Sequence, residues 1–129
     1  MSMKKSEITL QEIKARIKQF IKERDWEQFH SPKNISMSIS IEAAELMEHF
    51  QWLTTEQSKK LLKNNKKREK IEDELADIAI YIIDFCNLFN IDIEKIIIRK
   101  LDKSAKKYPA HIVKGKIHKY TYYRKLKNK

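Results

Sequence analysis

Apolar side chains recur every three to four positions along most of the chain, which is the spacing of one face of an α-helix. Residues 33–108 contain neither proline nor glycine. β-Hairpins and strand crossovers normally depend on such turn residues, so a strand-rich fold is not expected. The pattern predicts an all-α protein, a bundle of four to five helices, with long helices near residues 9–24, 36–53, 68–89 and 93–107.

Capping residues support the starts of two of these helices. Thr9 followed by Glu12 forms the pattern of a capping box, in which each side chain satisfies a backbone amide of the other residue. Asp92 directly precedes the last long helix and is a favoured N-cap residue. The remaining expectations are a loop at residues 26–34, a short helix or a connection at 54–67, and irregular structure after Pro109.

The helix predicted at residues 68–89 is apolar over nearly its whole circumference, which is typical of a helix surrounded by protein. It nevertheless carries one polar stripe, whose members follow steps of three, four and three residues. A second stripe follows the same steps along the helix predicted at 36–53. The two stripes consist of Glu74, Asp77, Tyr81 and Asp84, and of Glu42, Glu45, His49 and Trp52. Each stripe therefore begins with two carboxylates on one face and reaches an aromatic side chain one to two turns later.

Paired carboxylates on apolar helices need a compensating positive charge, because acidic side chains are rarely buried alone. Glutamates at helical spacing can also form a solvated face, and we accept this alternative for Glu48 and Glu72. For the four paired carboxylates the apolar surroundings favour a bound hard cation. Oxygen ligands suit Mg²⁺ or Mn²⁺, whereas zinc usually takes histidine and cysteine. Such ions bridge substrate phosphates, so the stripes predict phosphoryl or nucleotidyl transfer to water, with a base or sugar on the aromatic rings.

Positive charge gathers at the C-terminal end of the chain. The sequence has 28 Lys+Arg and 18 Asp+Glu residues, a net charge of +10, and residues 99–129 carry 12 of the basic residues but one acidic residue. We expect a catalytic domain at residues 1–113 and a basic tail at 114–129. The tail can serve phosphate groups, a polyanion or solubility. It lacks an arginine-rich or zinc-finger pattern that reads bases, so nucleic acid is not an expected partner.

Length and cysteine content indicate the cellular setting. A chain of 129 residues fits one domain with a sizeable core. Cys86 lies in an apolar run and has no second cysteine to pair with, as expected of a small buried side chain in a reducing compartment. The N-terminus lacks the apolar region of a signal peptide, and no segment reaches the roughly 18 apolar residues of a membrane span. We therefore expect a cytoplasmic protein with no membrane partner.

Five short motifs follow one another along the chain. They are RDWEQFH at residues 24–30, EAAEL at 42–46, FQW at 50–52, ELAD at 74–77 and KYP at 107–109. Together they resemble the all-α nucleoside triphosphate pyrophosphatases of the MazG-like superfamily, and within it the dCTP pyrophosphatase branch. The resemblance extends over roughly residues 9 to 120.

The resemblance implies a site and a reaction. At matching positions, the implied Mg²⁺ ligands are Glu42, Glu45, Glu74 and Asp77, with Mn²⁺ as an alternative ion. The implied aromatic substrate contacts are Trp26, Trp52 and Tyr81. The implied reaction converts a nucleoside triphosphate, with dCTP or a related pyrimidine deoxynucleotide expected, to the monophosphate and pyrophosphate, and so removes unwanted nucleotides from the pool. Family members are homo-oligomers whose subunits complete one another's pockets, so a tetramer or a dimer is expected.

Two positions depart from the family pattern. Ile17 stands where the dCTP-type relatives have a histidine in the pocket, which weakens an expectation of cytosine selectivity. Ser104 stands where many relatives have asparagine, which places one polar substrate contact in doubt. Lys100 and Lys107 are candidates for phosphate binding, although long lysines on a final helix are often solvated. The alternative hypothesis is a non-catalytic helical protein whose basic tail binds other proteins or nucleic acid; the four intact carboxylates favour the enzyme.

Overall fold

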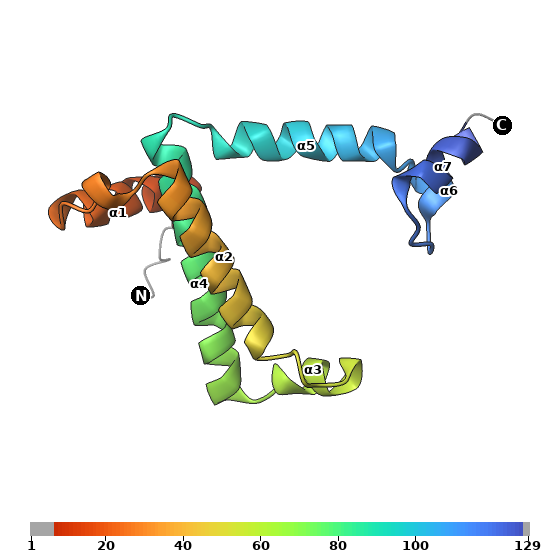
Figure 1. Ribbon diagram of the computed structural model, residues 1–129, viewed down its shortest axis with the longest axis horizontal. Helices are drawn as coiled ribbons and strands as arrows, with labels where there is room; N and C mark the ends of the chain where they lie inside the picture. The colour runs from red at the N-terminus through yellow and green to blue at the C-terminus, as the bar shows by residue number, and fades with distance from the viewer. Residues whose placement is uncertain (1–6, 128–129) are drawn as a thin grey trace, which may run out of the picture. The chain divides into compact units, whose positions relative to one another are not determined.

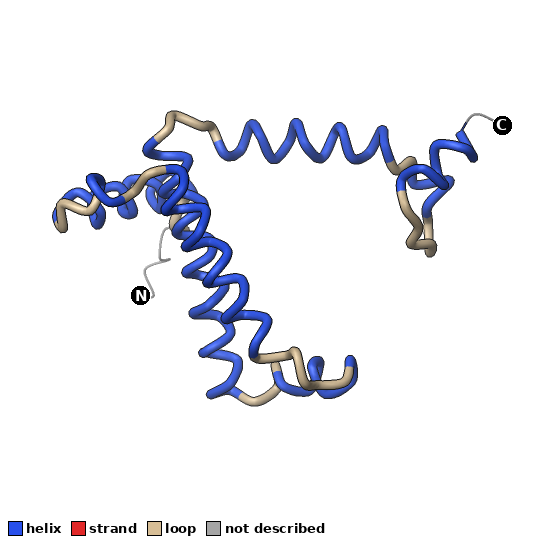
Figure 2. The backbone as a smooth tube through the Cα atoms, viewed as in Figure 1, coloured by secondary structure: helices blue, strands red, loops and turns tan. Residues whose placement is uncertain are grey.

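The computed structural model describes residues 7–127, and within them the regular structure is entirely helical (Figures 1 and 2). A single turn of 3-10 helix, η1 (Glu27–Phe29), accompanies the α-helices. These are α1 (Leu10–Glu23), α2 (Pro32–Glu48), α3 (Thr55–Leu61), α4 (Asn65–Leu88), α5 (Ile93–Lys107), α6 (Ala110–Val113) and α7 (Tyr120–Lys127). The predicted all-α class is therefore confirmed.

The chain divides between Ile91 and Asp92 into two compact units. This division follows packing, so the expected change from catalytic domain to basic tail at residue 113 stays a prediction. No helix in the described part of the chain is long and apolar enough to cross a bilayer.

Two long antiparallel helices, α2 and α4, lie side by side in the first unit (Figure 1). Helix α1 packs against α4 as well. The buried apolar side chains come from all three helices: Ile17 and Ile21 from α1, Ile35 from α2, and Ile71 and Ile83 from α4. Because α2 and α4 run in opposite directions along a shared seam, residues near the middle of each helix are brought next to one another.

Capping side chains fix the helix starts that were expected. The hydroxyl of Thr9 accepts a hydrogen bond from the backbone N–H of Glu12 at 3.2 Å, and the carboxylate of Asp92 accepts one from Lys95 at 3.0 Å. Both predicted N-caps are therefore confirmed. The segment predicted to be a short helix or a connection contains α3, which starts with a capping box at residues 54–57.

Two helices begin earlier than the sequence pattern predicted. Helix α2 starts at Pro32 instead of near residue 36, because the hydroxyl of Ser31 accepts the N–H of Asn34 and proline suits the first helical position. Helix α4 starts at residue 65 instead of near 68, because the Asn64 side chain accepts the N–H of Lys67 at 3.1 Å. The apolar pattern begins about one turn after the cap in α2, at Ile35, and about two turns after the cap in α4, at Ile71, so the pattern alone predicts a later start for both helices.

The expectation of irregular structure after Pro109 is wrong, since α6 and α7 both lie in that segment. An aromatic cluster explains the difference. The Tyr108 ring packs edge-on against Tyr120 and Tyr123, with ring centres 6.0 and 5.7 Å apart. The hydroxyl of Tyr123 also accepts the backbone N–H of His118 at 2.7 Å. These are tertiary contacts within the second unit, and they stabilise a helix that is too short to form alone.

Candidate metal centre and adjoining cavity

Three carboxylates converge where α2 and α4 pack together. Glu42 and Glu45 lie one turn apart on α2, and Glu74 lies on the neighbouring stretch of α4. One carboxylate oxygen from each of the three lies within 4.8 Å of the other two. Glu42 and Glu74 are partly buried, whereas Glu45 is exposed to solvent. The structure thus brings together three of the four acids that the sequence singled out.

Two of the carboxylates in this cluster have oxygen atoms that accept no hydrogen bond from the protein. The Oε2 atoms of Glu42 and Glu74 are buried, and neither has a hydrogen-bond partner. Burial, followed by the hydrogen bond and charge of Glu45 and the charge of Asp77, raises the pKa of Glu42 from 4.5 to about 7. Buried oxygens without a donor, surrounded by like charges, are stabilised by a bound cation. The oxygen-only donor set fits a hard divalent ion.

Asp77 and His49 lie beside the cluster. Asp77 is one turn after Glu74 on α4, and its charge acts on Glu42, but it is not one of the three converging residues. His49 follows α2 and places its Nε2 atom 3.9 Å from Oε1 of Glu74. This separation is too long for a hydrogen bond, so any attraction is electrostatic.

A cavity of about 210 Å³ adjoins the carboxylates. Its walls combine aromatic, aliphatic and acidic side chains: Phe20, Ile21, Trp26, His30, Glu42, Asp77, Ile80 and Tyr81. Two of the aromatic residues predicted to contact substrate, Trp26 and Tyr81, therefore lie in one cavity with two of the predicted metal ligands. The Trp26 indole is held edge-on against the Phe20 ring, with ring centres 5.8 Å apart.

A histidine–aspartate pair supports one wall of this cavity. Nδ1 of His30 lies 2.5 Å from Oδ2 of Asp84, which is only 2% exposed. Burial raises the pKa of Asp84, and the charge of His30 opposes that rise. The pair commits Nδ1 to Asp84 and leaves Nε2 as the ring nitrogen that can meet a ligand. Sequence reasoning placed Asp84 on the polar stripe but found no partner for it; an acid on an apolar helix was itself the signal that a partner exists.

Three other predicted substrate contacts lie away from the cavity walls. Trp52 follows α2 and is 87% exposed. Lys100 and Lys107 belong to α5 in the second unit, where the ammonium of Lys107 lies 4.4 Å from the centre of the Tyr120 ring. Roles for these residues stay predictions.

A second, more apolar cavity of about 320 Å³ lies beside the first. It is lined by Ile13, Arg16, Ile17, Phe20 and Ile80. Phe20 and Ile80 line both cavities, so the two spaces share a wall. Ile17 therefore makes a hydrophobic contribution next to the aromatic cavity, at the position where a histidine was expected from the family.

Three converging carboxylates on an antiparallel helix pair, next to a cavity with aromatic walls, are consistent with an all-α protein of the class that uses a divalent cation. Comparison with known families agrees with this class. The model of the MazG-like family matches residues 37–122, which is more than half of the chain. The chain belongs to the MazG-like family.

Individual relatives point to pyrophosphatases. The chain is 35% identical over 116 residues to dCTP pyrophosphatase 1 of Bos taurus, a match that covers 90% of this chain and 69% of the relative. It is 34% identical over 115 residues to dCTP pyrophosphatase 1 of Homo sapiens, covering 89% and 68%. A crystal structure of a pyrophosphatase from Archaeoglobus fulgidus superposes with a TM-score of 0.74 at 32% identity, covering 84% of this chain and 99% of that one. The resemblance found in the motifs is confirmed, and so is the expectation that the chain is an enzyme of the pyrophosphatase class.

Proposed function

We propose that this protein hydrolyses nucleoside triphosphates, with dCTP or a related pyrimidine deoxynucleotide as the preferred substrate, to the monophosphate and pyrophosphate. The observation that carries the proposal is the cluster of three carboxylates, two with unpartnered buried oxygens, next to a cavity walled by Trp26 and Tyr81. The names of the relatives support the choice of dCTP. In the cell, such an activity removes unwanted nucleotides from the cytoplasmic pool.

We propose Mg²⁺ as the cation, with Mn²⁺ able to replace it. Glu42, Glu45 and Glu74 are the converging ligands, and Asp77 is the fourth residue that we assign to the site. The oxygen-only donor set supports this choice of ion. A bound cation of this kind polarises phosphoryl oxygens and offsets the charge of the departing pyrophosphate.

The protein side chains position the nucleotide. Trp26 and Tyr81 offer ring faces and edges for the base and the sugar, and Ile80 adds an apolar side chain to the same wall. His30 is fixed by Asp84 and can hydrogen-bond the ligand through Nε2. In the reaction, a water oxygen bonds to the α-phosphorus, the bond from that phosphorus to the bridging oxygen breaks, and pyrophosphate leaves with the electron pair.

We propose that the active form is a homo-oligomer, a tetramer or alternatively a dimer. Large apolar side chains are exposed on both long helices of the first unit: Met37, Ile41 and Met47 on α2, and Leu75 on α4. Exposed apolar side chains in this number mark protein–protein contact surfaces. We propose that in this assembly Trp52 contacts the base or the sugar, and that Lys100 and Lys107 contact the phosphates of a bound nucleotide. Light scattering coupled to gel filtration measures the number of chains per particle.

The activity test follows product formation directly. The protein is incubated with each common and several modified deoxynucleoside triphosphates, with Mg²⁺ or with EDTA, and products are separated by ion exchange. We expect monophosphate and pyrophosphate, and not diphosphate and phosphate, only when Mg²⁺ is present. Glu45→Ala should abolish turnover, while Glu48→Ala, on an exposed part of the same helix, should not. The proposal fails if no triphosphate turns over and Glu45→Ala changes neither cation binding nor thermal stability.

A further inference from the structure

Charge is strongly segregated between the two units. Residues 1–91 contain 15 Lys+Arg and 15 Asp+Glu, a balance of zero. Residues 92–129 contain 13 Lys+Arg and 3 Asp+Glu, so the second unit carries the whole net charge of +10. The proposed catalytic carboxylates and the first cavity all lie in the neutral unit. Apart from Lys100 and Lys107, which the proposed function assigns to substrate phosphates, the charge of the second unit is a feature that the proposed reaction does not explain.

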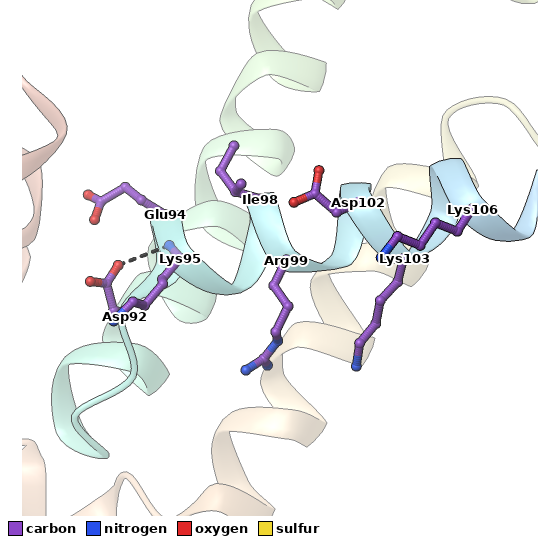
Figure 3. A pocket seen from close by; sticks show the side chains of 8 residues that line it. All are labelled: Asp92, Glu94, Lys95, Ile98, Arg99, Asp102, Lys103 and Lys106. Atoms are coloured by element: carbon purple, nitrogen blue, oxygen red, sulfur yellow. Dashed lines mark hydrogen bonds between the residues drawn. The ribbon is translucent and has the colours of Figure 1, made fainter. Parts of the chain in front are cut away.

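Within the second unit the positive charge increases toward the C-terminal end. One surface of α5 carries acidic and basic side chains together with one isoleucine (Figure 3). Its residues are Asp92, Glu94, Lys95, Ile98, Arg99, Asp102, Lys103 and Lys106. Arg99 and Lys103 extend to the same side of the helix (Figure 3). After Asp102 the sequence contains no further acidic residue, and residues 107–127 alone carry seven Lys+Arg. This part of the chain has no aspartate or glutamate of its own to offset its lysines.

The lysines between α6 and α7 are displayed on an ordered turn. Lys114 and Lys116 flank Gly115, whose φ of +72° reverses the chain direction there. The N–H of Lys116 bonds to the carbonyl of Val113 at 2.8 Å, which closes the turn. Lys119 directly precedes α7, and Ile117 between these lysines is 96% exposed. The three ammonium groups are thus carried on a defined backbone facing solvent.

An exposed aromatic ring lies next to these lysines. Tyr122 is 44% exposed, and its ring centre lies 4.3 Å from that of His118, with the two planes tilted by 40°. Tyr123, in contrast, is buried in the aromatic cluster of the unit. Phosphate-binding cations beside a solvent-facing aromatic ring are the two elements with which proteins bind single strands without reading sequence.

We propose that residues 108–126, which we call the basic segment, bind single-stranded nucleic acid without sequence preference. The lysines neutralise backbone phosphates, and the Tyr122–His118 pair offers a surface on which a base can stack. This function needs no base-reading motif, and the absence of such a motif from the tail therefore does not argue against it. It is independent of the proposed hydrolytic activity.

Two other occupants fit the basic segment less well. A second copy of this chain offers no net negative charge, because its first unit is neutral overall and its second unit is positive. An anionic membrane needs a continuous apolar face beside the cations. Among the described residues from 103 onward, the exposed large apolar side chains are three scattered ones, Tyr108, Ile117 and Tyr122. A nucleic-acid strand requires only the cations and the ring.

The test measures binding of the full chain to a fluorescent oligothymidylate of about 20 nucleotides by anisotropy, across a range of salt concentrations. The triple variant Lys114→Gln, Lys116→Gln, Lys119→Gln removes three cations outside the proposed catalytic site. We expect its affinity at about 0.1 M salt to fall at least about tenfold, and the slope of log K against log salt to become shallower by about 2. The matched control, Lys60→Gln, Lys63→Gln, Lys66→Gln, removes the same charge from the first unit and should leave affinity and slope unchanged.

Two further variants test the stacking part of the proposal. Tyr122→Ala should weaken binding by about tenfold without changing the salt slope, and Tyr122→Phe should retain parental affinity. Circular dichroism of each variant shows that the helices are intact. The proposal is overturned if the oligonucleotide does not bind, if the two triple variants behave alike, or if phosphatidylserine vesicles or duplex DNA bind as tightly as the single strand.

Discussion

Replacing Glu42 by glutamine removes a carboxylate whose ionised form is disfavoured by burial and by its acidic neighbours. We expect the replacement to stabilise the protein without a divalent cation and to lower its stability relative to the parent when the cation is present. Burial, followed by the hydrogen bond and charge of Glu45 and the charge of Asp77, raises the pKa of Glu42 from 4.5 to about 7. The folded state therefore binds the Glu42 proton more tightly than the unfolded chain does. The contribution of this proton to the free energy of unfolding is complete below about pH 4.5 and is lost as pH rises through about 7.

The size of this effect follows from the shift. A change from 4.5 to about 7 corresponds to on the order of 3 kcal/mol between the two protonation states. This is an upper limit, because Glu42 is only partly buried and water screens its neighbours. For a chain of this length each kcal/mol moves the melting temperature by about 3 to 5 °C, so the expected difference is at most about 15 °C.

Thermal melts of the parent and of Glu42→Gln, followed by circular dichroism, measure the difference. In EDTA the two proteins should melt alike near about pH 4.5, and the variant should be the more stable one near about pH 8. With Mg²⁺ at about a hundredfold excess over its dissociation constant, the parent gains about 2.7 kcal/mol near pH 8 and the variant gains less. The gain of the parent should shrink as pH falls through 7, because protonation of Glu42 competes with the cation.

Glu48→Gln is the matched control, since it removes a carboxylate from an exposed position on the same helix. It should change neither the pH dependence nor the response to Mg²⁺. The reasoning is refuted if Glu42→Gln is the less stable protein in EDTA at alkaline pH. It is equally refuted if Mg²⁺ stabilises Glu42→Gln and the parent by the same amount.

Three further predictions concern the first unit, and Ile117 in the second unit serves as a control for one of them. His30→Ala leaves Asp84 buried without its partner and should lower the free energy of unfolding by about 3 kcal/mol, measured by urea denaturation. Adding Asp84→Asn to His30→Ala should recover part of that loss, and simple additivity of the two single changes would contradict a coupled pair. Trp26→Ala should raise the KM for dCTP by about tenfold through loss of ring contact, and an unchanged KM would remove Trp26 from the binding wall. Ile35→Ala, at 1% exposure, should cost about 2 to 4 kcal/mol by urea denaturation, whereas Ile117→Ala, at 96% exposure, should cost less than about 0.5.

The sequence was most informative where a structural signal is local. The Asp92 cap bonds to an N–H three residues away, and the apolar stripe of α4 repeats every turn, so both could be predicted from a short window. The start of α2 depends on a cap of the same kind, Ser31 followed by Pro32. The apolar pattern begins later and therefore predicted a later start. Helix α7 could not be predicted in this way. Its stability depends on rings at Tyr108 and Tyr123, which approach each other only once the chain has folded.

The candidate site shows the same limit at a longer range. The spacing of Glu42 and Glu45, three residues apart, was sufficient to predict that both project in one direction. Their approach to Glu74 depends on the antiparallel packing of α2 and α4. The sequence indicated this packing only indirectly, because the acid pairs on the two apolar helices both need a positive counter-charge and can share one. His30 lies 54 residues before Asp84, and no periodicity links them. A buried acid indicates that a partner is required, but it does not indicate where that partner lies in the sequence. For this reason the His30–Asp84 contact could not be predicted from the sequence.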